Sequence, residues 1–313
     1  MRPLALVRLA ALARRWVLAL ALLLCPALAA GGVTLVLSQA QGGYAEAGAA
    51  FQQELQRLGV RTPVTVLERP QFQAQGANGS QLLVVVGLPA LETALAQEPR
   101  LPVLALLVSR PAFERLVAAR GGGRRVSAVF LDQPLARQLD LIRLTLPEVG
   151  RLAVLTGPDS RDWGERLTAL AGERRLRLQQ AEVSAEPDIY RALEQVLHGA
   201  GALLALPDRV VSNPGTIQNL LLTAYRHKVP VVGFSQAYVR AGALLAVHSS
   251  PAQIGAQGAE LARHFLAQGQ LPLAQHPRYF AVSINHHVAR SLGLSLEPET
   301  VLLERLMRQE REP

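Results

Sequence analysis

The chain has 313 residues, half of them hydrophobic, which is enough for two domains with sizeable cores and excludes a disordered chain. The formal net charge of +8 points toward nucleic acid, but the basic residues are nearly all arginine, with Lys228 the only lysine. Arginines are interspersed with acids, as in ERLTALAGERRLRLQQAE (165–182), which is typical of a solvated helix surface. We therefore expect no nucleic-acid partner.

Residues 1–30 predict a secretory signal peptide. Four arginines in the first fifteen residues precede the apolar run WVLALALLLC and an Ala-Leu-Ala exit at 27–29. The run is shorter than the roughly 20 residues of a membrane-spanning helix, so cleavage near Ala29 or Ala30 is favoured over an anchor. Cleavage would leave 28 basic and 24 acidic residues, a net charge of +4. We expect an exported, periplasmic protein.

Cys25 is the single cysteine and lies within this targeting segment. A mature chain cut after it has no disulfide, thiol nucleophile or thiolate metal site. Lipid attachment at Cys25 is the alternative, since the cysteine ends the apolar run. Leu24 occupies the preceding position, where a lipobox has a small residue, so the sequence favours a form without lipid.

The region after residue 30 alternates short Val/Leu-rich runs with amphipathic stretches, the pattern of repeated βα units on parallel sheets. Eleven strands are predicted, at 33–37, 64–67, 82–86, 103–107, 127–131, 152–155, 176–183, 202–206, 229–234, 243–247 and 279–284. Eleven strands are too many for one compact sheet in a chain of this length. The break falls after the fifth strand, near FLDQP, and predicts two lobes.

Helices are predicted between these strands, several of them with proline in the first turn, where its missing N–H is tolerated. Their ranges are 44–58, 89–96, 111–119, 134–146, 161–171, 189–197, 216–227 and 251–268. A further terminal helix is expected in the tail that begins at Glu297.

Many predicted strands end in a polar or glycine-containing stop. Because the carboxyl ends of parallel strands meet at one edge of a sheet, these stops and the helix N-termini after them could hold a small polar solute. N-capping and turn formation explain each position taken singly. The candidate ligand-binding residues are Ser38, Gln39, Gly87, Leu88, Asp132, Gln133, Asp159, Ser160, Asp208, Phe234, Ser235 and His248.

Catalytic and metal motifs are weak in this sequence. GFSQA at 233–237 approximates a G-x-S-x-G nucleophile elbow around Ser235, but alanine replaces the second glycine and no aspartate follows. His286 and His287 are adjacent, so on a helix their rings point about 100° apart and not toward one metal ion. We expect no enzyme activity, cofactor or metal, with a serine hydrolase that uses Ser235 as the weaker alternative.

Two long segments resemble a known family: VSAVFLDQPLARQLDLIRLTLPEVGRLAVLTGPDS and ALPDRVVSNPGTIQNLLLTAYRHKVPVVGFSQAYVRAGALLAVHSSPAQIGAQGAELARHFLAQGQLP. They are similar to ABC-transporter substrate-binding proteins, including those for tryptophan and other aromatic amino acids, which have the type I periplasmic binding protein fold. The resemblance spans about 33–294 and is weakest between 61 and 80.

The resemblance implies two Rossmann-like lobes joined by three hinge crossovers that close around a solute. Lobe 1 would comprise 33–132 and 248–275, and lobe 2 would comprise 133–247 and 276–313. The chain departs from the family at two places. Pro207, Asp208 and Arg209 stand where relatives have a Thr-Asp-Asn or similar triplet, and Leu88 replaces a threonine whose hydroxyl can hold a solute carboxylate.

These observations predict a monomeric periplasmic protein that captures a small polar solute and presents it to an ABC permease. A protein that reports the bound solute to a membrane signalling receptor is the alternative, because ligand-driven closure could be read by either partner. A secreted interaction module with a vestigial cleft is a third hypothesis.

Overall fold

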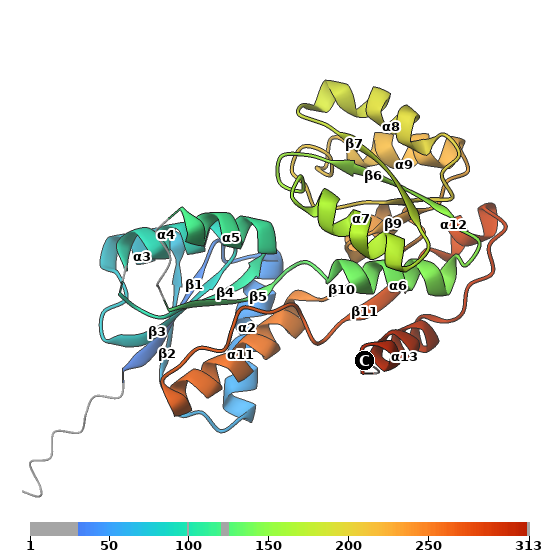
Figure 1. Ribbon diagram of the computed structural model, residues 1–313. Helices are drawn as coiled ribbons and strands as arrows, with labels where there is room; N and C mark the ends of the chain where they lie inside the picture. Colours follow the sequence, from blue (N-terminus) through green and yellow to red (C-terminus); the bar gives the residue numbers. More distant parts are fainter. Residues whose placement is uncertain (1–30, 99, 120–124, 312–313) are drawn as a thin grey trace, which may run out of the picture.

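The computed structural model describes residues 31–98, 100–119 and 125–311, so the predicted signal peptide and Cys25 lie outside the described residues. Two lobes lie side by side, each built on a largely parallel sheet with helices on both faces (Figure 1). The predicted α/β fold with two Rossmann-like lobes is confirmed.

Lobe 1 contains a five-stranded parallel sheet in the order β2-β1-β3-β4-β5. Its strands are β1 (Gly32–Leu37), β2 (Val64–Glu68), β3 (Ser80–Val86), β4 (Val103–Val108) and β5 (Val126–Phe130). The central strands β3 and β4 are continuous apolar runs because helices bury both of their faces, as expected for parallel sheets.

Two helix layers cover this sheet. On one face, α2 (Gly42–Arg57) and α11 (Pro251–Gln268) pack side by side and bury Phe51 and Phe265 against the strands. The opposite face carries α3 (Arg69–Gln75), α4 (Leu88–Gln97) and α5 (Arg110–Ala118). Although α11 is far along the chain, it completes lobe 1, as its orange ribbon beside the blue α2 shows (Figure 1).

Lobe 2 contains a six-stranded sheet in the order β11-β10-β9-β8-β6-β7, parallel except for the edge strand β11. Its strands are β6 (Arg151–Thr156), β7 (Arg177–Glu182), β8 (Ala202–Leu204), β9 (Val231–Gly233), β10 (Leu245–His248) and β11 (Ala281–Ile284). The sheet break therefore falls after β5, where the sequence predicted it.

Helices cover both faces of the second sheet as well. One face packs against α6 (Leu135–Thr145), α7 (Trp163–Glu173), α12 (His286–Ser291) and α13 (Glu299–Gln309). The other packs against α8 (Ile189–Leu197), which follows the 3-10 turn η1 (Glu186–Asp188), and against α9 (Ile217–Arg226) and α10 (Gln236–Ala241).

Three short helices were not predicted from the sequence: α3, α10 and α12. Each has six or seven residues, too few for a 3.6-residue apolar period to be recognised. Local caps define them instead. Ser235 Oγ accepts the Tyr238 N–H at the start of α10, and Asn285 accepts two backbone N–H groups at the start of α12.

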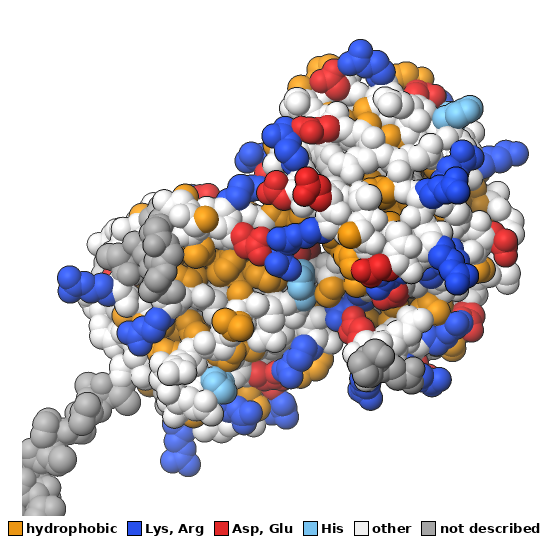
Figure 2. Space-filling view, in the orientation of Figure 1, with side chains coloured by type: hydrophobic (Ala, Val, Ile, Leu, Met, Phe, Trp, Pro, Cys, Tyr) orange, Lys and Arg blue, Asp and Glu red, His pale blue; other side chains and the backbone are white. Residues whose placement is uncertain are grey.

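The chain passes between the lobes three times. It leaves lobe 1 between β5 and α6, returns between β10 and α11, and crosses again between Gln275, which bridges to Val129 of β5, and β11. These crossovers run next to one another and form the floor of the space between the lobes. On the face seen in Figure 2, acidic and basic side chains are interspersed over both lobes.

Candidate functional site at the hinge between the lobes

A cavity of about 420 Å³ lies between the lobes, directly above the crossovers. Its volume is within the range of about 300–1,000 Å³ that is usual for small-molecule sites. Both lobes and the crossovers contribute to its wall. The lining residues are Gly43, Glu46, Ser109, Leu131, Asp132, Gln133, Gln138, Pro207, Phe234, Ser235, Gln236, Ala237, Arg240, His248, Ser249, Ser250 and Pro251.

Five of the twelve candidate residues meet in this cavity: Asp132, Gln133, Phe234, Ser235 and His248. They come from three places in the chain, namely the first crossover, the end of β9 and the end of β10. The topology brings them together because β9 and β10 are neighbours in the sheet and their carboxyl ends face the first crossover.

A hydrogen-bond network ties the three crossovers to one another. Gln133 Nε2 donates to Ser249 Oγ at 2.8 Å, and that hydroxyl donates to the Tyr279 carbonyl at 2.5 Å. Arg137 Nη1 donates to Gln133 Oε1 at 2.5 Å and to the Pro277 carbonyl at 2.9 Å. The floor of the cavity is therefore positioned by side chains of the first two crossovers and backbone carbonyls of the third.

Arg137 also connects this floor to the C-terminal helix. Its guanidinium forms a two-pronged ion pair with Glu310, at 2.5 and 2.8 Å, and its carbon Cζ lies 3.8 Å from the centre of the Phe280 ring. The side chain is buried, so its charge needs these partners. These contacts consequently hold the Arg137 side chain in place beneath the cavity.

Asp132 occupies the first crossover with its side chain buried. Oδ1 accepts the backbone N–H of Arg110, the first residue of α5, at 2.6 Å. Burial raises the pKa of this carboxyl group to about 6, because loss of water outweighs the backbone hydrogen bonds and the Arg110 charge. The Asp132 carbonyl accepts a hydrogen bond from His276 Nδ1 at 2.9 Å.

His248 and Ser235 reach the cavity but are already used by the fold. His248 Nε2 lies 2.9 Å from Ser283 Oγ on the neighbouring strand, and burial lowers the pKa of its imidazole. Ser235 Oγ caps α10 by accepting the Tyr238 N–H at 3.1 Å. Within the described residues, no histidine or carboxylate is hydrogen-bonded to Ser235, so the arrangement offers no base for a serine nucleophile.

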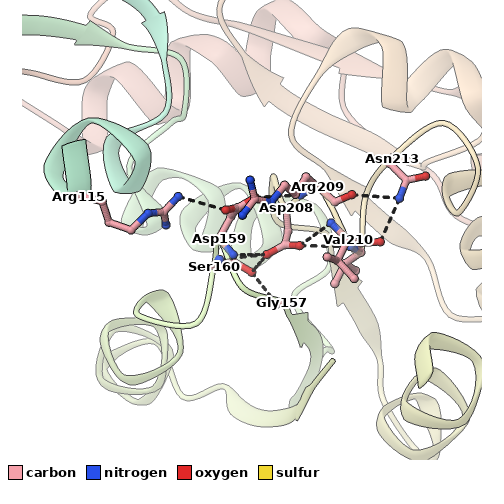
Figure 3. A network of polar contacts seen from close by, with 9 residues as sticks. Arg115, Gly157, Asp159, Ser160, Asp208, Arg209, Val210 and Asn213 are labelled. Atoms are coloured by element: carbon pink, nitrogen blue, oxygen red, sulfur yellow. Dashed lines mark hydrogen bonds and ion pairs between the residues drawn. The ribbon is translucent and has the colours of Figure 1, made fainter. Parts of the chain in front are cut away.

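Asp208, Asp159 and Ser160 lie outside this cavity and form a network of their own (Figure 3). Asp208 Oδ2 accepts the backbone N–H groups of Asp159 and Ser160 and the Ser160 hydroxyl, at 2.9 to 3.0 Å. Oδ1 accepts the N–H groups of Val210 and Val211. The buried carboxylate thus accepts hydrogen bonds from five donors and connects two loops of lobe 2.

This network reaches across to lobe 1 at one point. Asp159 Oδ1 pairs with Arg115 of α5 at 3.1 Å, and its Oδ2 lies 3.4 Å from Arg209 Nε (Figure 3). The Arg115 pair is therefore an exposed ionic contact between the lobes, away from the crossovers.

The four candidates in lobe 1 also lie outside the cavity. Ser38 Oγ donates to the Val86 carbonyl at 2.8 Å and accepts the Ala90 N–H at 3.1 Å, while Gln39 is exposed. Gly87 has φ +93°, and a Cβ there would lie 2.6 Å from Ser38 Oγ. Leu88 begins α4 and packs against the core of lobe 1. In this structure Ser38, Gly87 and Leu88 shape the β3–α4 turn.

Sequence reasoning missed several residues of the cavity wall, including Glu46, Ser109, Leu131, Gln138 and Arg240. Gln138 and Arg240 lie within helices, where no strand-end signal marks them. Gln138 is the more informative, because it is 1% exposed and Oε1 has no hydrogen-bond partner among the described residues. Its Nε2 donates to the Gln133 carbonyl at 3.3 Å.

Within residues 31–98, 100–119 and 125–311, no cluster of three or more His, Cys, Asp or Glu side chains could hold a metal ion. None of the helices described there has the length and apolar character needed to cross a bilayer.

A sequence model of the family described as ABC transporter substrate binding protein matches residues 71–305. No curated protein matches the chain significantly.

Solved structures share the fold at low sequence identity. An ABC domain from Streptococcus pneumonia in complex with L-Trp is 18% identical, with a TM-score of 0.63, over 88% of this chain and 98% of the other. A ligand-free, open substrate binding protein with adhesive properties from Clostridium difficile is 16% identical, with a TM-score of 0.69, over 85% and 95%. A conserved domain protein from Vibrio cholerae is 20% identical, with a TM-score of 0.63, over 87% and 98%.

Proposed function

Because the chain belongs to the ABC transporter substrate-binding protein family, we propose that it captures a small polar solute between its lobes and delivers it to an ABC permease. The observation that carries this proposal is the cavity of about 420 Å³ whose wall combines residues of both lobes with the first and second crossovers. A solute in that position contacts both lobes at once. It therefore favours the closed arrangement by as much as it binds that arrangement more tightly.

We expect Asp132, Gln133, Phe234, Ser235 and His248 to form the solute-binding surface, since these candidates already line the cavity. Asp159, Ser160 and Asp208, together with the lobe 1 residues Ser38, Gln39, Gly87 and Leu88, would contact a solute only if closure moved them toward it. Phe234 supplies an aromatic face, and the crossovers supply polar groups. This combination of a mostly apolar wall with a few placed polar groups suits a small organic solute.

Solute binding is tested by thermal unfolding with a panel of amino acids, purines, small organic anions, organic amines and sugars. A ligand at about 100 times its Kd adds roughly 2.7 kcal/mol of stability, which is readily measured. Small-angle scattering with and without the stabilising compound then reports closure. A panel that leaves the melting temperature unchanged would contradict the proposal.

Members of this family are normally periplasmic or exported, and we propose the same for this chain through cleavage of residues 1–30. N-terminal sequencing of the protein recovered from its native host is expected to begin near residue 30. Recovery of an intact or lipid-modified N-terminus would contradict this expectation.

The transporter partner is tested by uptake of the identified solute in cells with and without this gene. Loss of uptake supports delivery to a permease. Normal uptake, with loss of a solute-dependent transcriptional response, would instead support the reporting of solute to a membrane receptor.

A further inference from the structure

The hinge end of the cavity contains two buried oxygen-bearing groups whose hydrogen bonding is incomplete. The first is the Gln138 amide in α6, which is 1% exposed. Oε1 has no partner among the described residues, while Nε2 is held at 3.3 Å by the Gln133 carbonyl. A buried acceptor without a donor is unfavourable and rare in folded proteins. We therefore expect this oxygen to accept a hydrogen bond from an N–H or O–H group of another molecule.

The second group is the Asp132 carboxylate, which is 7% exposed. The backbone N–H groups of Arg110 and of Asp132 itself bond to this carboxylate, but the Arg110 guanidinium pairs with Glu114 at 2.7 Å. His276 Nδ1 lies 3.7 Å from Oδ2 and donates instead to the Asp132 carbonyl. Burial, the main cause, lowers the pKa of that imidazole; the Arg110 and Arg137 charges act in the same direction, and the hydrogen bond to Asp132 and the Glu114 charge oppose them.

Other polar groups of the inner wall do not offset this excess of acceptors. Both ends of the Gln133 amide are engaged, by Ser249 and by Arg137. The His248 imidazole bonds to Ser283, and burial keeps its pKa below the ordinary value. The cavity therefore presents acceptors at its hinge end, and the buried Arg137 guanidinium beneath its floor is paired with Glu310.

The remaining wall of the cavity includes apolar side chains, and its mouth carries two charged ones. Leu131 is 45% exposed at the first crossover, and Phe234 faces the same space from lobe 2. The charged side chains that line the cavity elsewhere, Glu46 of lobe 1 and Arg240 of lobe 2, are exposed and opposite in sign. The mouth thus has no net preference for anions or cations.

We infer that the solute carries a protonated nitrogen group that donates hydrogen bonds to Gln138 Oε1 and the Asp132 carboxylate, with a compact apolar body against Leu131 and Phe234. This inference rests on the proposed function and adds the chemical class of the solute, an organic amine. The inference does not require a carboxylate on the solute, because both acceptors bond to the donor end of the molecule. Charge-assisted bonds from an ammonium group would satisfy both buried acceptors.

The raised pKa of Asp132 agrees with this geometry. A carboxyl group that is only partly compensated by its neighbours gains most from a cationic donor placed beside it.

Matched sets of three compounds test the inference by isothermal titration at pH 7.5. One set consists of phenethylamine, L-phenylalanine and 3-phenylpropanoate, a second of tryptamine, L-tryptophan and indole-3-propanoate, and a third of 3-methylbutylamine, L-leucine and 4-methylpentanoate. We expect an amine to bind, and its carboxylate-only counterpart to show no binding. Binding of an amino acid but not of its amine, or of a carboxylate alone, would overturn the inference.

Failure of the inference is distinguishable from failure of the proposed function. If sugars, purines or organic anions stabilise the protein and every amine fails, the solute class is wrong and solute binding stands. If neither these compounds nor the amines bind, both are contradicted.

Substitution of each acceptor residue tests whether the amine binds there. Gln138→Leu keeps the shape and removes the acceptor, and Asp132→Asn removes the charge. Each is expected to weaken binding of the best amine by about tenfold or more, the effect of a hydrogen bond to a charged group. Gln218→Leu, at an exposed position of α9 outside the cavity, is the matched control and is expected to change Kd less than about twofold.

The melting temperature of each variant without ligand shows whether the variant is folded. Gln138→Leu removes an unpaired buried amide oxygen, which is favourable, but also the long 3.3 Å bond from Nε2 to the Gln133 carbonyl, so we expect little net change in thermal stability. A folded Gln138→Leu protein that binds the amine as tightly as the wild type would overturn the role assigned to Gln138.

Discussion

Asp132 and Asp208 are both buried aspartates that follow a strand, yet they lie in different surroundings. The Asp208 carboxylate accepts hydrogen bonds from five donors of its own lobe, so its capacity is used within the fold. Asp132 receives backbone N–H groups, its pKa is raised to about 6, and it faces the cavity between the lobes. A buried aspartate at a strand end can thus either organise a loop or bind a ligand. The number of hydrogen bonds that its carboxylate already accepts within the protein distinguishes these two roles.

The largest effect is expected for Asp208→Asn, because an amide cannot accept all five hydrogen bonds and presents its own donors to backbone N–H groups. We expect a loss of about 2–4 kcal/mol in the free energy of unfolding. Urea denaturation measures this loss in the free energy of unfolding. Asp162→Asn is the control, since Asp162 precedes α7 without a side-chain cap bond, and a change below about 0.5 kcal/mol is expected there. Equal effects of the two substitutions would break the comparison.

Asp132→Asn is expected to alter the pH dependence of stability. The pKa of Asp132 rises from 3.8 to about 6 on folding, so the folded protein holds this proton more tightly than the unfolded chain does. The resulting stabilisation is present below about pH 4 and is lost as the pH rises through 6. Relative to the wild type, the asparagine variant should gain about 2–3 kcal/mol between pH 3.5 and pH 7, at about 1.4 kcal/mol per pKa unit. Denaturation at both pH values checks this, and a constant difference would contradict it.

Gly157→Ala tests how tightly the Asp208 network is packed. A Cβ at Gly157 would lie 2.4 Å from Asp208 Oδ1, so the carboxylate would have to move away from its donors. We expect a loss of about 1–2 kcal/mol in the free energy of unfolding. Gly150→Ala, with nothing within 4 Å of the added atom, is the matched control. If both alanines are tolerated equally, the loop is more adaptable than its hydrogen bonds indicate.

The smallest effect is expected where the Asp208 loops contact lobe 1. Arg115→Ala removes the ion pair with Asp159, whose partners are partly exposed, so about 0.2–1 kcal/mol is involved. Loss of this interlobe contact should speed dissociation of a bound solute by about two- to fivefold, measured by stopped flow at low salt. Arg161→Ala, which breaks a pair with Glu182 inside lobe 2, should leave the rate unchanged. A faster rate in both variants would point to a general charge effect.

Much of the fold could be predicted because the signals are local. All eleven predicted strands occur, and the long helices begin within a few residues of their predicted positions. Continuous apolar runs such as β4 mark strands buried on both faces, and helical spacing in α6 marks a one-sided core contact. The short helices α3, α10 and α12 were missed because side-chain caps, not periodicity, define them.

The candidate site was only partly predictable. Strand-end polarity selected Asp132, Phe234 and His248, which the sheet order brings into one cavity, but it selected Ser38 and Asp208 by the same signal. Gln138 carries no such signal, since it lies within a helix and looks like an ordinary polar residue. Its burial and its unpaired oxygen become visible only in the folded chain.

By itself, the sequence determined the alternation of strands and helices and the two-lobed division, because apolar periodicity and local turn chemistry are local features of the chain. The family followed from the resemblance of two long segments to known proteins. Only the tertiary structure decided which polar side chains are already satisfied and which still face the space between the lobes. Hydrogen-bond partners come from residues far apart in sequence: Asp208 meets Ser160 across 48 positions, and Gln133 meets Ser249 across 116. Whether a polar group serves the fold or a ligand depends on these distant partners.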